Sequence, residues 1–234
     1  MPNWVYNGLT IEGKTESVKS LIEQMNKPFV DYIEPLGDLS FGIKQRKYIN
    51  PVFSFRNIIA PTDLVAYKKQ PEFKAEGEQN DWYSWNTRNW GVKWDVAVAE
   101  DDNYPSTNME EAANGENYVV HYNFETAWGV PQPALKLLSS QYPDLLFTLS
   151  YEEETGWGGE MEFLRGEMIS NSEYDSMCRD CEATDCMEYC ENDCGQICAV
   201  CNWLGEADLE SVAECQTHKI YLDTKVPEYR KVEA

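Results

Sequence analysis

The eight cysteines of this chain restrict its folding more than any other feature, because all of them fall within one short segment. They lie between Cys178 and Cys215, and the rest of the 234-residue sequence contains none. Two pairs have Cys-x-x-Cys spacing, Cys178 with Cys181 and Cys198 with Cys201, and sixteen residues separate the pairs. Each pair can fold as a tight turn that directs two sulfurs to one point, and two such turns complete a tetrahedron. We therefore expect a four-thiolate zinc site built from these two pairs.

The remaining cysteines leave the metal content of this segment open. A second tetrahedral zinc site would use the other four, Cys186, Cys190, Cys194 and Cys215. The four-residue spacing from Cys186 to Cys198 would alternatively form a stripe of buried thiols along one helix face. An iron–sulfur cluster is an alternative to zinc, and His218 is a candidate additional ligand. If the chain is secreted, four disulfides become the expected arrangement instead.

The charge of the chain is strongly negative and unevenly distributed. The formal net charge is −22, from 41 acidic and 19 basic residues. Such a surface disfavours direct binding of nucleic acid, because phosphates require Lys and Arg. Residues 173–214 contain twelve acidic residues and one Arg, which is half of the net charge. The pattern favours a protein partner with a basic surface, such as a nucleic-acid-handling protein.

The composition indicates a folded chain with no membrane span. Aromatic residues make up 13% of the sequence, which is typical of a protein with a core. No apolar run approaches the ~20 residues of a membrane span. The N-terminal residues lack the charged and apolar regions of a signal peptide. We therefore expect a cytosolic protein, and in a cytosol clustered cysteines bind metal more often than they form disulfides.

The hydrophobic pattern predicts an α+β fold. Helices are expected from about Thr15 or Ser17 to Pro28, over residues 61–67 and over residues 131–142. Residues 29–50 and 101–116 are expected to be irregular. Strands are expected over residues 4–11, 94–100, 117–125, 144–152, 160–168 and 218–223. This order predicts a sandwich with helices on one face of a largely antiparallel sheet. The sheet domain would comprise residues 1–168 and 216–226, interrupted by an acidic, zinc-binding insert over residues 169–215 and followed by a tail over residues 227–234.

Three short blocks resemble a known family. The first is Pro-Asn-Trp at residues 2–4 followed by Asn7. The second is Asn-Trp-Gly-Val-Lys-Trp-Asp at residues 89–95, and the third is Phe-Glu-Thr-Ala-Trp-Gly-Val-Pro at residues 124–131. Their order and spacing, with Gly-Gly-Glu at residues 158–160, resemble the YubB-like family of phage and plasmid proteins. The resemblance implies a ferredoxin-like fold and a mobile-element origin, implies no catalytic residue, and does not extend to the cysteine-rich segment.

The second and third blocks contain candidate binding residues: Trp90, Lys93, Trp94, Asp95, Glu125 and Trp128. Their indole rings would stack on a base, another ring or a partner's side chain. The alternative is a structural role, in which Trp90 and Trp94 are core residues, Gly91 forms a tight turn and Asp95 caps a chain end. In that case Trp128 packs beneath the helix that follows it.

The sequence favours a binding protein over an enzyme. It contains no nucleophile elbow, P-loop or dinucleotide-binding glycine fingerprint. His121 lies in an alternating strand, where a structural role is expected. We therefore expect an acidic interaction protein of a phage or mobile element, located in the host cytoplasm. It would bind a host protein, for example a defence nuclease, with the zinc-stabilised insert as a contact module. The alternative is an enzyme or a nucleotide- or small-ligand-binding module that uses the tryptophan-rich region.

Overall fold

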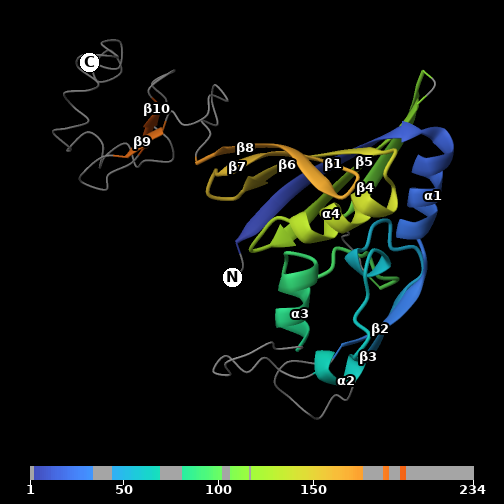
Figure 1. Cartoon of the computed structure of the whole chain (residues 1–234). Helices are drawn as coiled ribbons and strands as arrows, with labels where there is room; N and C mark the ends of the chain where they lie inside the picture. The colour runs from blue at the N-terminus through green and yellow to red at the C-terminus, as the bar shows by residue number, and fades with distance from the viewer. Residues whose placement is uncertain are drawn as a thin grey trace, which may run out of the picture. The chain divides into compact units, whose positions relative to one another are not determined.

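The computed structural model describes residues 3–33, 44–68, 81–101, 106–115, 117–175, 187–189 and 196–198. Its main element is a six-stranded sheet with the order β4-β5-β1-β6-β7-β8 (Figure 1). These strands are β1 (Trp4–Lys14), β4 (Asn108–Asn114), β5 (Asn117–Ala127), β6 (Leu146–Glu153), β7 (Gly158–Leu164) and β8 (Glu167–Tyr174). The helices α1 (Thr15–Met25) and α4 (Gln132–Gln141) follow β1 and β5 along the chain.

The order of these elements is that of a ferredoxin-like fold. Along the chain, β1-α1-β4 and β5-α4-β6 form two βαβ units. In the sheet, β1 pairs antiparallel with both β5 and β6, and β5 pairs antiparallel with β4. The two units are therefore interleaved, and β7 and β8 extend the sheet beyond β6. The predicted α+β class with a largely antiparallel sheet is confirmed.

One face of the sheet is buried. Along β1, Val5, Asn7, Leu9 and Ile11 are buried, whereas the side chains that alternate with them are partly or fully exposed. This period of two is expected for a strand whose one face contacts a core. The two helices contribute the apolar residues Val18, Leu21, Met25, Ala134, Leu135 and Leu138 to that core. The predicted helices over residues 15–28 and 131–142 are confirmed.

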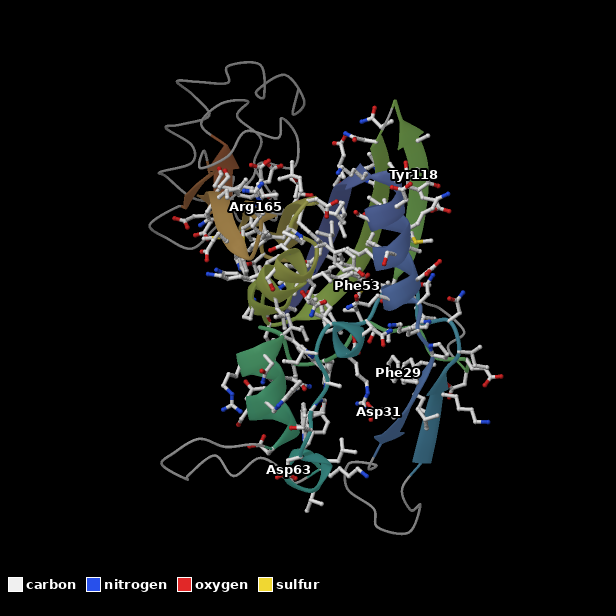
Figure 2. All side chains as sticks on the ribbon, turned by 45° about the vertical axis from the view of Figure 1, so that its right-hand side comes forward. Phe29, Asp31, Phe53, Asp63, Tyr118 and Arg165 are labelled. Atoms are coloured by element: carbon white, nitrogen blue, oxygen red, sulfur yellow. The ribbon has the colours of Figure 1, made fainter. Side chains whose placement is uncertain are left out.

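The segment between α1 and β4 contains further elements and contacts the buried face of the sheet. It contains the hairpin of β2 (Phe29–Ile33) and β3 (Lys44–Tyr48), the 3-10 turn η2 (Phe55–Asn57), α2 (Leu64–Tyr67) and α3 (Trp82–Asn89). Figure 2 shows Phe53 between the sheet and the hairpin that carries Phe29 and Asp31. The Phe53 ring stacks on Phe124 of β5 with 5.3 Å between centroids, so this segment is anchored in the main core.

Three expectations for the secondary structure are wrong. Residues 29–50 contain the β2–β3 hairpin, in which none of the described side chains is buried. Residues 101–116 contain β4, an edge strand in which no side chain is buried, so burial left no signal in its sequence. Residues 94–100 are not a strand, because the Asp95 carboxylate accepts the Val96 N–H and the Glu100 N–H binds the Lys47 carbonyl.

The expected single strand over residues 160–168 is two strands. Arg165 and Gly166 both have positive φ, 56° and 80°, and they form the connection between β7 and β8. Two successive residues with positive φ are characteristic of a two-residue hairpin turn. Gly166 supplies that conformation without strain, whereas the arginine before it gives no comparable sequence signal.

The chain divides into two compact units. One comprises Met1–Glu154 with Gly159–Ser172, and the other comprises Thr155–Gly158 with Glu173–Ala234. In the second unit the structure describes an antiparallel hairpin of β9 (Met187–Tyr189) and β10 (Gln196–Cys198). The predicted strand over residues 218–223, His218 and every cysteine side chain lie outside the described residues. None of the helices in the described ranges is long and apolar enough to cross a membrane.

Candidate functional site

Three segments that are far apart in the sequence meet at one end of the sheet. The backbone N–H of Trp128 donates to the carbonyl of Asn3 at 3.0 Å, and that of Lys93 donates to the carbonyl of Ala127 at 3.4 Å. The rings of Trp4 and Trp94 are 6.1 Å apart. The blocks at residues 2–7, 89–95 and 124–131 are therefore neighbours in space.

Glycine allows two of these segments to cross closely. Gly91 has φ +85°, and a Cβ at this position would lie 2.6 Å from Pro133 Cδ and 2.7 Å from the Val130 carbonyl oxygen. A Cβ at Gly129 would lie 3.0 Å from the Gly91 oxygen. Real Cβ atoms do not approach backbone this closely, so a side chain at Gly91 would force the loops apart. The predicted tight turn at Gly91 is confirmed.

A buried hydrogen-bond relay fixes the loop that carries Trp128. Asn7 Nδ2 donates to Thr126 Oγ1 at 2.9 Å, and Thr126 Oγ1 donates to the Gly129 carbonyl at 2.7 Å. Trp128, between them, has φ +69°, a conformation that costs a non-glycine residue of order 1–2 kcal/mol. Strained residues of this kind concentrate at functional sites, where the surrounding structure holds them in place.

The two loops present exposed indole rings around one ammonium group. Lys93 Nζ lies 4.3 Å from the centroid of the Trp94 ring and 3.9 Å from that of Trp128, within the range of cation–π attraction. Trp94 is 40% exposed and Trp128 is 51% exposed. Trp4 borders Trp94, and the Tyr83 ring of α3 meets Trp128 edge-on at 6.1 Å. We call Trp4, Tyr83, Lys93, Trp94 and Trp128 the indole surface.

Trp90 lies in the core. It is 2% exposed, and its indole N–H donates to the Ile59 carbonyl at 3.1 Å. Its ring meets Trp85 edge-on at 5.4 Å and lies 6.1 Å from Phe55. These contacts give Trp90 a packing role that links α3 to the 3-10 turn.

Asp95 holds the chain around η2. Its carboxylate accepts hydrogen bonds from the Ser54 hydroxyl at 2.6 Å and from the backbone N–H groups of Phe55, Arg56 and Val96 at 2.8, 3.2 and 2.8 Å. Burial raises the pKa of the Asp95 carboxyl above its usual range, and the hydrogen bonds oppose that shift. With its carboxylate oxygens occupied by these donors, Asp95 caps a turn within the fold.

Glu125 and His121 lie on the outer face of the sheet, the face opposite the core. Glu125 pairs with Tyr6 across β5 and β1, and Tyr6 is 51% exposed. His121 is exposed and its Nδ1 is 2.9 Å from Thr10 Oγ1, so it has the structural partner expected of a sheet histidine. Of the six candidate binding residues, Lys93, Trp94 and Trp128 are thus brought together. Trp90 lies in the core, Asp95 binds the chain around η2, and Glu125 is on the outer face of the sheet.

The sequence analysis did not predict Trp4 or Tyr83 as site residues. A signal was present for Trp4, because alternation in β1 places this residue opposite the buried Val5. Tyr83 carried no signal, because its position depends on how α3 packs against the Trp128 loop.

Within the described ranges, no group of three His, Cys, Asp or Glu side chains is placed to hold a metal ion. The predicted ligands Cys178, Cys181 and Cys201 lie outside those ranges. Cys198 ends strand β10, where only its backbone is described. The zinc site therefore stays a prediction from the cysteine spacing.

Comparisons with known proteins identify the domain type. Residues 93–197 match the family described as "Ferredoxin-like domain in Api92-like protein", and the match continues into the cysteine-rich segment. A protein api92 from Yersinia pseudotuberculosis, whose crystal structure is known, aligns with a TM-score of 0.42 and 11% identity. The alignment covers 76% of this chain and 100% of that chain. No curated protein matches the sequence. Residues 93–197 are thus similar to the ferredoxin-like domain of Api92-like proteins.

Proposed function

We propose that this chain is a protein-binding module whose indole surface is its contact site. The supporting observation is that Trp94 and Trp128, both about half-exposed, surround the ammonium group of Lys93 on two interlocked loops. Trp and Tyr are enriched at the centres of protein interfaces because each buries a large area with few rotatable bonds. Exposed apolar rings gathered at one place on a monomer mark an interaction surface.

The rigidity of the site supports this proposal. The Asn7–Thr126–Gly129 relay and the close crossing at Gly91 fix the backbone of both loops before any partner arrives. Little conformational entropy is then lost at these loops on binding, which favours affinity. If these loops had only a structural role, a glycine at position 128 would adopt the positive φ without the strain that Trp128 carries.

The charge of the chain supports a partner with a basic surface. With a net charge of −22, the protein would attract such a partner at long range and would repel bare nucleic acid. We propose further that the chain is an interaction factor of a phage or mobile element, similar to YubB-like proteins, that binds a host protein such as a nucleic-acid-handling or defence protein. The cysteine spacing supports a zinc-stabilised insert as an additional acidic contact.

Capture of partners from host lysate tests the proposal. Trp94→Ala and Trp128→Ala should each reduce recovery of a stoichiometric partner at least tenfold, because central tryptophans carry ~2 kcal/mol or more of interface energy. The control is Val65→Ala, which shortens a 77% exposed apolar side chain on α2. Equal recovery with the Trp variants and the control would refute the indole surface as the contact site. A co-purified nucleotide lost in the same variants would instead support a ligand-binding module.

A further inference from the structure

The outer face of the sheet carries a second arrangement next to the indole surface. Tyr6 of β1 is paired with Glu125 of β5 on one side and with Glu152 of β6 on the other. Directly paired side chains project from the same face, with Cβ atoms about 5 Å apart. A half-exposed phenol ring therefore stands between two carboxylates in one row across three strands.

The next row of the sheet carries short polar side chains beside this ring. Gly8, two residues after Tyr6, pairs with Asn123 and Ser150, and it is partly exposed. A glycine within a central strand has no side chain to pack and often marks a place where another chain approaches the backbone. A Cβ at Gly8 would lie 3.0 Å from Ser150 Oγ and 3.7 Å from Asn123 Oδ1, so a hydroxyl and an amide line the row beside the Tyr6 ring.

The charge of the sheet is almost entirely of one sign. Its six strands contain ten glutamates and a single Lys or Arg residue, Lys14, at the end of β1. Lys14 is eight residues from Tyr6 along the strand, or roughly 27 Å at the rise of a β-strand. Among the described side chains, no ion pair is formed by Glu125 or Glu152. A cation that reaches this row would therefore meet two carboxylates with no competing basic group on the sheet.

We propose that Tyr6, Glu125 and Glu152 form a receptor site for a single Lys or Arg side chain of the protein partner. The ring would attract the cation through its face, and the two carboxylates would accept its N–H donors. Trp4 belongs to the indole surface and lies two residues before Tyr6 on the same face, so both sites are able to contact one partner. The inference rests on the proposed function and specifies the chemistry of the partner.

A peptide with a single cationic side chain is a suitable probe of the site. A peptide with many cations would bind any acidic protein through several nonspecific contacts. The probe is acetyl-Gly-Arg-Gly-amide, titrated into ¹⁵N-labelled protein, and its neutral counterpart contains citrulline in place of Arg. The Arg peptide should give saturable shifts at the amides of Tyr6, Gly8, Glu125 and Glu152, and the citrulline peptide should not. Shifts spread evenly over acidic surfaces, or equal shifts with citrulline, would overturn the proposal.

Variants distinguish binding at Tyr6, Glu125 and Glu152 from nonspecific attraction by the net charge of the protein. The double change Glu125→Gln with Glu152→Gln should weaken the Arg peptide about tenfold, because two ion pairs and their hydrogen bonds are lost. Tyr6→Leu should weaken it severalfold, whereas Tyr6→Phe should not. The control is Glu23→Gln with Glu100→Gln, two exposed glutamates outside the sheet that give the same change in net charge. A comparable loss in the control pair would show that only net charge matters.

The two proposals fail separately. Trp128→Ala should abolish partner capture and leave the Arg peptide bound, because Tyr6 does not depend on the Trp128 ring. If the Arg peptide does not bind while capture still requires Trp128, the receptor site is wrong and the indole surface stands. If the peptide binds and capture is insensitive to Trp128, the indole surface is wrong, and partner capture by the Glu125, Glu152 double variant then decides whether the cation site acts alone.

Discussion

Gly91 is the residue on which the geometry of the indole surface most directly depends. A methyl group there would overlap the Pro133 ring and the Val130 carbonyl, and the residue has φ +85°. Gly91→Ala should therefore destabilise the protein by about 2–4 kcal/mol, which combines the cost of a left-handed residue with that of a steric overlap. Urea unfolding followed by tryptophan fluorescence measures this change in the free energy of unfolding.

Gly115 provides a matched control for this substitution. It also has a positive φ, 62°, but a Cβ there would meet nothing within 4 Å. Gly115→Ala should lower the free energy of unfolding by only about 1 kcal/mol, because it places a non-glycine residue at positive φ without a steric overlap. Equal effects of the two changes would mean that the loops at Gly91 are free to separate, and that the indole surface is less rigid than the distances imply.

At the scale of elements, burial explains what the sequence predicted and what it did not. The strands β1, β5 and β6 and the helices α1 and α4 each present an apolar face to the core, so their periodicity predicted them. The hairpin β2–β3 and the edge strand β4 are held by pairing with a neighbour, and none of their described side chains is buried. Hydrophobic periodicity in a sequence arises from burial of one face of an element, so it does not predict elements that have no buried face.

The candidate site shows the same limit. Motif blocks predicted Lys93, Trp94 and Trp128 as binding residues, and the structure brings these three together. The spacing of the blocks along the chain did not predict that they meet, because the contact depends on the antiparallel register of β1 and β5. The register of two strands depends on which residues face the core along their whole length. A single short block therefore does not determine the register.

The junction of β1 and β5 carries the prediction that belongs to this scale. Asn7 and Thr126 are both buried and are linked at 2.9 Å, so removal of either side chain leaves polar groups without partners. Asn7→Ala and Thr126→Val should each destabilise by about 1–3 kcal/mol, and the double variant should lose about 1 kcal/mol less than the sum. Chemical denaturation of the wild type, the two single variants and the double variant measures the four free energies of unfolding for this double-mutant cycle.

An exposed asparagine serves as the reference for that cycle. Asn123 lies on the outer face of β5, where its side-chain amide donates to Asn108 Oδ1 at 3.1 Å. Asn123→Ala should change stability by less than about 0.5 kcal/mol and should be additive with Thr126→Val. Additivity of Asn7→Ala with Thr126→Val would show that the relay does not hold the Trp128 loop.

At the scale of the whole molecule, the division into two units and the position of the cysteines lead to one prediction. The first unit has a continuous apolar core, whereas residues 173–214 are acidic and contain few large apolar residues. Such a segment cannot fold by burial alone, and a bound metal ion would supply the missing free energy. Purified protein should contain about one or two zinc ions per chain.

Removal of the metal should then affect only one unit. After chelation, a protease should cleave within residues 173–214 while residues 4–168 resist, because a continuous apolar core stabilises the sheet. Metal-free protein with eight oxidised cysteines would contradict the zinc site directly. Simultaneous loss of protection in both segments would mean that they share one cooperative core, and that the sheet depends on the cysteine-rich segment for its stability.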